Sequence, residues 1–162
     1  MAENVFKEPP GGRWFLIALG LIINLCLGSV YSWSVFVNPL TKHFTDIGQS
    51  VSATDVLLPF SIFLATFAIA MVFSGKYIEK YGPRKMAMAG GILCGLGWLM
   101  ASTASSVQML YPTYGIIGGL GVGIAYGCPV AVAARWFPDK RGLAVGLTVL
   151  GFGFSALSLI HI

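Results

Sequence analysis

Long stretches without a charged side chain constrain this chain more than any other feature. They cover residues 14–37, 56–75, 86–134 and 142–162. A transmembrane helix needs about 20 consecutive apolar residues, and each stretch reaches that length. Hydrophobic residues make up 56% of the chain and charged residues only 10%, a composition that leaves too little polar surface for a soluble domain. We therefore predict an all-α membrane protein.

The third stretch is too long for one span. Polar residues at positions 102–108 and Pro112 just beyond them divide it into two helices of membrane length. The sequence thus predicts five helices, near residues 14–37, 55–77, 84–104, 109–134 and 139–160. Residues 1–13 form a short leader, and residues 14–162 form one transmembrane unit.

The cationic residues fall on one side of the predicted membrane. Nine precede the first helix or lie in the loops after the second and fourth, whereas Lys42 lies on the opposite side. The nine are Lys7, Arg13, Lys76, Lys80, Arg84, Lys85, Arg135, Lys140 and Arg141. Cytoplasmic loops carry the excess of Lys and Arg, so we expect a multi-pass protein of the plasma or inner membrane with a cytoplasmic amino terminus. Cations confined to helix ends do not form a nucleic-acid surface.

Cysteine and histidine give no sign of a metal site. Cys26, Cys94 and Cys128 lie inside apolar stretches, their spacing matches no zinc pattern, and His43 and His161 are distant from them in sequence. We expect neither a disulfide framework nor a metal or other cofactor.

Glycines at a four-residue spacing mark the fourth predicted helix. Gly115, Gly119, Gly123 and Gly127 advance about 40° per step, so they form a slowly winding groove of small residues. In lipid, such grooves let neighbouring helix backbones approach closely. We predict helix packing for these glycines, with a direct substrate role as the alternative.

Neutral polar residues are the remaining candidates for a binding site, because the predicted spans contain no Asp, Glu, Lys or Arg in their interiors. Asn24, Gly28 and Tyr31 are spaced i, i+4, i+7 and therefore share one face of the first helix. With Tyr126 on the fourth helix, Asn24 and Tyr31 are candidate substrate-binding residues; the alternative is ordinary packing. Tryptophans prefer the headgroup zone, and only for Trp33 does a cavity role stay open.

A serine hydrolase is the third hypothesis. Ser155 follows a glycine two residues earlier, and His161 lies nearby in sequence. Six residues turn a helix by about 240° beyond a full turn, so the two side chains point to different sides. No third group is available to orient the histidine.

The loop between the second and third helices carries a known signature. Residues 75–85 read Gly-Lys-Tyr-Ile-Glu-Lys-Tyr-Gly-Pro-Arg-Lys, which resembles the signature of the major facilitator superfamily. The matching positions are Gly75, Glu79, Lys80, Gly82, Arg84 and Lys85, with Glu79 in place of the usual Asp. The resemblance implies that this loop bridges two six-helix halves on the cytoplasmic side and acts as a conformational gate that holds the outward-open state.

Four more segments, residues 28–33, 119–127, 135–144 and 151–153, narrow the resemblance to the oxalate/formate antiporter group, which is related to monocarboxylate transporters. It implies that Tyr31 and Tyr126 line the substrate cavity and that carboxylate-binding cations come from helices beyond this chain. Val30, Phe63 and Phe67 replace polar residues of the oxalate exchanger, which argues against oxalate itself.

The expected function is therefore secondary active transport, antiport or symport, of mono- or dicarboxylates by alternating access. Its partners would be the anion, the lipid bilayer and the carboxyl-terminal half of the transporter. Five helices make an incomplete amino-terminal half, and the chain is still apolar at Ile162. A non-transporting fragment, or a half-transporter that needs a partner chain, is the alternative.

Overall fold

The computed structural model describes residues 12–160, with side chains over residues 12–155, and every regular element in that range is helical. The predicted leader lies almost entirely outside the described residues, as does His161. Four helices are long and apolar enough to cross a membrane, and a fifth, shorter apolar helix follows over Arg141–Ser155. The chain is thus an all-α membrane protein.

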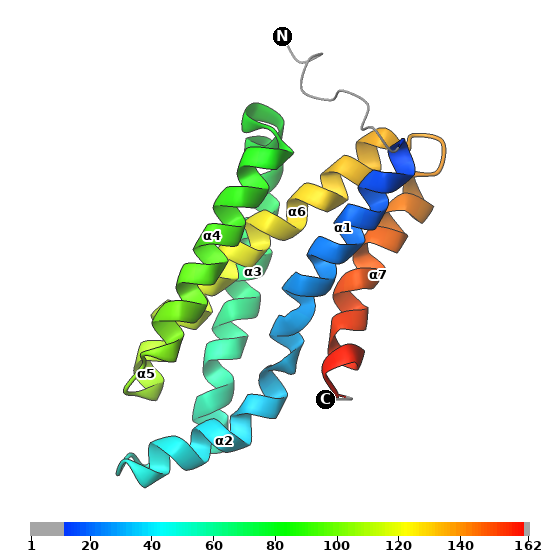
Figure 1. Cartoon of the computed structure of the whole chain (residues 1–162). Helices are drawn as coiled ribbons and strands as arrows, with labels where there is room; N and C mark the ends of the chain where they lie inside the picture. Colours follow the sequence, from blue (N-terminus) through cyan, green and yellow to red (C-terminus); the bar gives the residue numbers. More distant parts are fainter. Residues whose placement is uncertain (1–11, 161–162) are drawn as a thin grey trace.

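The first helical stretch runs further than the sequence predicts. α1 (Arg13–Leu27), the 3₁₀ segment η1 (Gly28–Ser32) and α2 (Trp33–Asp46) follow one another without a break. The sequence predicts an end near residue 37, because the apolar run stops there. That point marks the edge of the apolar segment and not the end of the helix, whose last turns are polar and project beyond the bundle (Figure 1).

The second and third helices join at a tight turn. α3 (Ala53–Tyr81) begins at a capping box, in which Asp55 accepts a hydrogen bond of 2.8 Å from the backbone N–H of Ser52. It ends at Gly82, whose φ of +86° is a conformation that glycine adopts readily. Pro83 then opens α4 (Pro83–Ser102), at a position where its missing N–H costs nothing.

The fourth helical stretch contains a π-helical segment. α5 (Val107–Leu110) leads into a π-helical segment, η2 (Tyr111–Gly118), and then α6 (Gly119–Trp136). Pro112 lies in the π segment, where its lack of an N–H disturbs the regular α-helical ladder. The fifth helix, α7 (Arg141–Ile160), follows a short loop.

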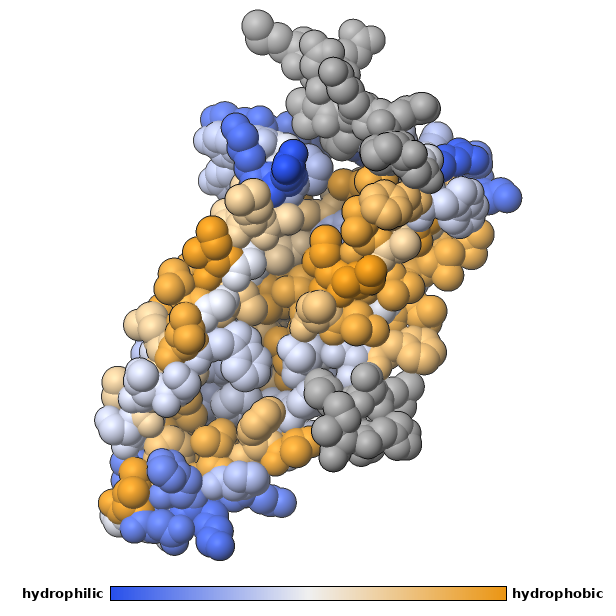
Figure 2. Space-filling view, viewed as in Figure 1, coloured by the Kyte–Doolittle hydropathy of each residue, from blue (hydrophilic) through white to orange (hydrophobic). Residues whose placement is uncertain are grey.

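Figure 1 shows α6 crossing the middle of the bundle. It packs against α3 and α4 on one side and against α1 and α7 on the other, and α1 lies along α7. Hydrophobic side chains cover much of the middle of the molecule and hydrophilic ones gather at its two ends (Figure 2). Large apolar side chains such as Val72, 74% exposed, face outward, as lipid contact requires.

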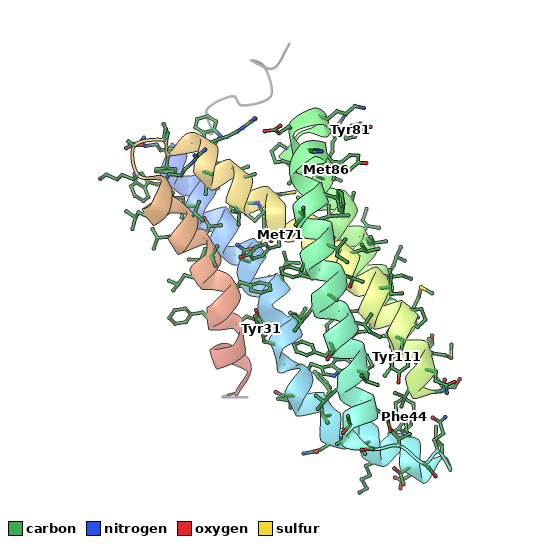
Figure 3. The ribbon with its side chains drawn as sticks, turned by 180° about the vertical axis from the view of Figure 1, so that it is seen from behind. Tyr31, Phe44, Met71, Tyr81, Met86 and Tyr111 are labelled. Atoms are coloured by element: carbon green, nitrogen blue, oxygen red, sulfur yellow. The ribbon has the colours of Figure 1, made fainter. Side chains whose placement is uncertain are left out.

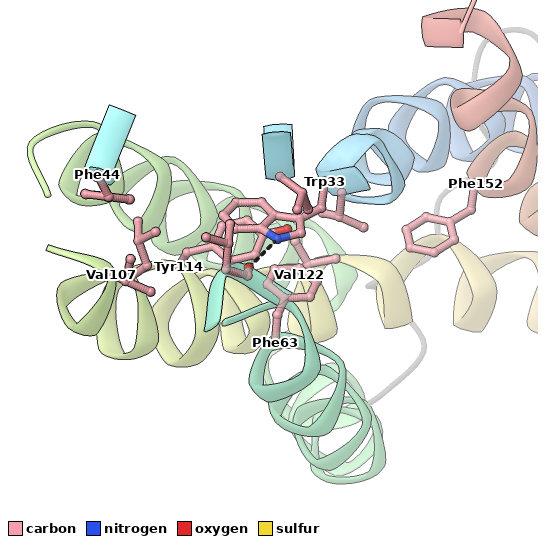
Figure 4. Packing of buried hydrophobic residues seen from close by; sticks show 11 residues of the cluster. Trp33, Phe44, Phe63, Val107, Tyr114, Val122 and Phe152 are labelled. Atoms are coloured by element: carbon pink, nitrogen blue, oxygen red, sulfur yellow. Dashed lines mark hydrogen bonds between the residues drawn. The ribbon is translucent and has the colours of Figure 1, made fainter. Parts of the chain in front are cut away.

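A stack of aromatic rings forms the core near α2 (Figure 4). The Tyr114 ring lies between Trp33, at a centroid distance of 4.1 Å, and Phe63, at 4.9 Å. The indole N–H of Trp33 donates a hydrogen bond of 3.0 Å to the carbonyl of Val56. Trp33 is therefore a core residue and not an interfacial one. Its ring stacks on Tyr114, and its N–H has a backbone acceptor.

Candidate functional site

The 3₁₀ segment η1 positions Tyr31. It begins at Gly28, which lies so close to α7 that an added Cβ would collide with the carbonyl oxygen of Phe152 and lie 2.7 Å from the Cβ of Ser155. The tighter winding of a 3₁₀ helix changes the direction in which the following side chains point. Tyr31 lies near the middle of the bundle, away from Phe44 at one end and Tyr81 at the other (Figure 3), and it is 43% exposed.

Four aromatic rings from four helical segments meet at this point; we call Tyr31, Phe67, Tyr126 and Phe152 the aromatic cluster. Phe152 on α7 contacts Tyr31 edge to face at 5.1 Å between ring centroids, and Tyr126 on α6 in the same manner at 4.9 Å. Phe67 on α3 stacks on Phe152 at 6.1 Å and meets Tyr126 at 5.5 Å. The structure thus brings the two predicted tyrosines together around one ring.

The two phenol hydroxyls in the aromatic cluster are available for a ligand. Neither Tyr31 nor Tyr126 makes a hydrogen bond to another described residue. A phenol hydroxyl donates one hydrogen bond and so suits a carboxylate oxygen. Since the cluster carries no charged side chain, it offers hydrogen bonds and apolar contact but no charge to neutralise an anion.

Asn24 lies on α1, four residues before Gly28 and outside the aromatic cluster. It is fully buried, and its side-chain amide donates a hydrogen bond of 2.8 Å to the carbonyl of Thr148 on α7. Its Oδ1 has no hydrogen-bond partner among the described residues. Asn24, Gly28 and Tyr31 do share one face, as their spacing predicts, and in the structure that face packs on α7.

The predicted glycine groove of α6 and η2 lies against α3. An added Cβ would meet Ile62 at Gly115, the carbonyl of Phe63 at Gly119, the Cβ of Ala70 at Gly123 and the hydroxyl of Ser74 at Gly127, at 2.7 to 2.9 Å in each case. Real Cβ contacts are longer than this. The structure therefore places all four glycines where α3 approaches closely.

The signature loop lies at the end of the molecule where α1 begins. Gly82 forms the turn, Gly75 has open space around it, and Lys80, Arg84 and Lys85 are exposed. Glu79 forms an ion pair with Arg135 at the end of α6, at 3.3 Å between the carboxylate oxygen and the guanidinium. The loop therefore contacts the fourth helical stretch. Both side chains of this ion pair are about half exposed or more, so the pair contributes little stability.

A second ion pair ties the start of α1 to the loop before α7. Arg13 contacts both carboxylate oxygens of Asp139, at 3.0 and 3.1 Å, and its guanidinium lies 4.9 Å from the centre of the Phe137 ring. Desolvation raises the pKa of Asp139, but hydrogen bonds from its own backbone and from Arg13, with the charges of Arg13 and Lys140, lower it below its usual value. This pair links the start of α1 to the loop before α7, and because both side chains are nearly half exposed it also contributes little stability.

A model of the Major Facilitator Superfamily matches residues 17–159. The chain belongs to this superfamily. It is 36% identical over 151 residues to the oxalate:formate antiporter of Oxalobacter formigenes, covering 93% of this chain and 35% of that protein. Human monocarboxylate transporter 2 is 34% identical, covering 88% of this chain and 30% of that protein, and rat monocarboxylate transporter 13 is 32% identical, covering 93% and 35%.

The chain spans about a third of the length of these superfamily relatives. They are membrane transporters and not enzymes, so the hydrolase hypothesis is wrong. Ser155, the serine of that hypothesis, is buried against Gly28 at the α1–α7 interface. Among the residues with described side chains, no group of His, Cys, Asp and Glu is placed to hold a metal ion.

Two parts of the site were beyond sequence reasoning. Phe152 lies in the segment 151–153 that carries the resemblance, but nothing in its spacing indicates that it, and not the exposed Phe154, contacts both tyrosines. Arg13 and Asp139 are 126 positions apart, and their pairing depends on α1 lying along α7. The turn-forming sequence Phe-Pro-Asp at residues 137–139 was the one available signal, and it indicates only a loop.

Proposed function

We propose that the complete protein is a secondary active transporter for small organic anions, mono- or dicarboxylates, that works by alternating access. Superfamily membership supports the transporter class, and the names of the relatives support the substrate class. The observation that carries the proposal is the convergence of Tyr31 and Tyr126 on one ring, with both hydroxyls free of described partners.

In this mechanism the two phenols donate hydrogen bonds to the carboxylate, while Phe67 and Phe152 exclude water from that side. Hydrogen bonds to a charged acceptor are stronger in a site from which water is excluded. The aromatic cluster lacks a cation, so the positive charge that neutralises the anion comes from the rest of the transporter, which is the chain's main partner besides the bilayer. Asn24 supports the site indirectly, by fixing α1 to α7 through Thr148.

The signature loop serves as the conformational gate in this proposal. The α3–α4 turn lies at the same end of the bundle as the start of α1 and the α6–α7 loop (Figure 1), and it carries Glu79 and the cations Lys80, Arg84 and Lys85. Exposed charges at helix ends can exchange partners when two halves of a transporter part. The excess of cations at this end supports a cytoplasmic amino terminus in the plasma or inner membrane.

Counterflow in liposomes tests the proposal. Full-length protein is reconstituted into vesicles loaded with an unlabelled carboxylate, and uptake of labelled oxalate, formate, lactate and pyruvate is measured. We expect saturable accumulation of at least one carboxylate, and no transport by residues 1–162 alone, because one incomplete half forms no closed pathway. Failure of the full-length protein to take up any carboxylate would refute the proposal.

A further inference from the structure

Phe152 lies at the centre of the aromatic cluster but is nearly closed to solvent. Its side chain is only 7% exposed, whereas Tyr31 is 43% exposed. Both tyrosines present their rings to it edge to face, with interplanar angles of 73° for Tyr31 and 64° for Tyr126. A ring in this position has little surface to offer a substrate, so its contribution must act through the two phenols.

The ring of Phe152 has little freedom to move. It lies nearly parallel to the ring of Phe67, with an interplanar angle of 10° and 6.1 Å between the ring centroids. The backbone around it is equally confined, because Gly28 lies directly against the carbonyl of Phe152 and Gly151 lies against the backbone of Leu21. Where helix backbones approach closely through glycines, a side chain at the contact has little space to change its conformation.

We propose that Phe152 is a positioning residue, which holds the hydroxyls of Tyr31 and Tyr126 at the separation needed to donate to one carboxylate group. This inference rests on the proposed function. Edge-to-face contacts fix the direction of each phenol ring, and therefore the direction of each hydroxyl. A site whose donors are already aligned binds its ligand without an ordering cost. Phe152 thus affects the affinity for the carboxylate and not the turnover rate or folding.

The test uses full-length protein in liposomes and a matched set of variants. Phe152→Leu removes the ring and keeps an apolar side chain, whereas Phe152→Tyr keeps the ring. Phe154→Leu makes the same chemical change on the same helix, at a side chain that is 51% exposed. We expect Phe152→Leu to raise the KM for carboxylate counterflow about tenfold with little change in kcat and Phe152→Tyr to raise it less, while Phe154→Leu stays near wild type.

A double-mutant cycle separates positioning from a purely structural role. Tyr31→Phe and Tyr126→Phe together remove both hydroxyls and should raise KM by themselves. Once the hydroxyls are gone, Phe152→Leu has nothing left to align, so we expect it to add no further increase. An additive increase in KM, or an equal loss of kcat for every substrate, would overturn the positioning role.

The outcomes separate this inference from the proposed function. Absence of carboxylate counterflow by the wild-type protein would refute the transporter proposal. An unchanged KM on removing both hydroxyls would refute the tyrosine site. If removing the hydroxyls raises KM but Phe152→Leu does not, the positioning role alone is wrong and the transporter proposal stands.

Discussion

Gly28→Ala is the most informative substitution at the α1–α7 interface. The new Cβ would lie 2.7 Å from the Cβ of Ser155, where ordinary contact begins at 3.4 Å, and would collide with the carbonyl of Phe152. α7 must therefore retreat from α1 by roughly 1 Å, at a cost of about 1–3 kcal/mol for overpacking. Since this shift moves Phe152 away from Tyr31, the loss extends to the aromatic cluster.

We expect Gly28→Ala to lower the rate of carboxylate counterflow by the full-length protein by tenfold or more, because a displacement of about 1 Å can cost about 100-fold when a site is pre-aligned. Gly91→Ala is the matched control, since Gly91 is exposed on α4 with nothing within 4 Å of the added Cβ. Rates are normalised to the amount of folded protein in each vesicle preparation. Wild-type transport by Gly28→Ala, or an equal loss in Gly91→Ala, would refute the reasoning.

Three further predictions concern stability, measured as thermal unfolding of the full-length protein in detergent. Gly123→Leu should destabilise by about 1–3 kcal/mol or more, while Gly146→Leu, with open space around it, should not. Because the folded-state pKa of Asp139 is lowered, its pairing with Arg13 stabilises above the usual carboxyl pKa and is lost as pH falls through the lowered value; Asp139→Asn should abolish this dependence. Tyr114→Phe should stabilise by about 1 kcal/mol, because the buried Tyr114 hydroxyl has no hydrogen-bond partner in the described part of the chain; a lower unfolding temperature would contradict this.

The helices and the glycine face follow from local sequence. Charge-free runs and cations at their ends predict where spans lie, since both reflect the cost of burying charge in lipid. A four-residue glycine spacing predicts one close-packed face whatever the partner, and the structure supplies the partner, α3. Helix ends are less predictable, as α2 shows, because a helix continues into water where its polar residues permit.

The assembly of the candidate site depends on contacts far apart in sequence. The resemblance to a known group identifies Tyr31 and Tyr126 as site residues. It includes the segment 151–153 but assigns Phe152 no role, and Phe152 reaches the two tyrosines because α7 packs along α1. Trp33 illustrates the converse. A tryptophan near a span end is typical of the headgroup zone. Trp33 instead lies in the core, where its ring stacks on Tyr114 and its N–H donates to the carbonyl of Val56.

In the proposed transporter, Tyr31 faces the path of the carboxylate. The most direct test is to make Tyr31→Cys in full-length protein whose Cys26, Cys94 and Cys128 are replaced by serine, and to follow its reaction with a membrane-impermeant thiol reagent in liposomes. We expect the reagent to label position 31 and a transported carboxylate, but not chloride, to slow that labelling. A cysteine at position 31 that stays unlabelled, or that reacts at the same rate with and without carboxylate, would contradict the account.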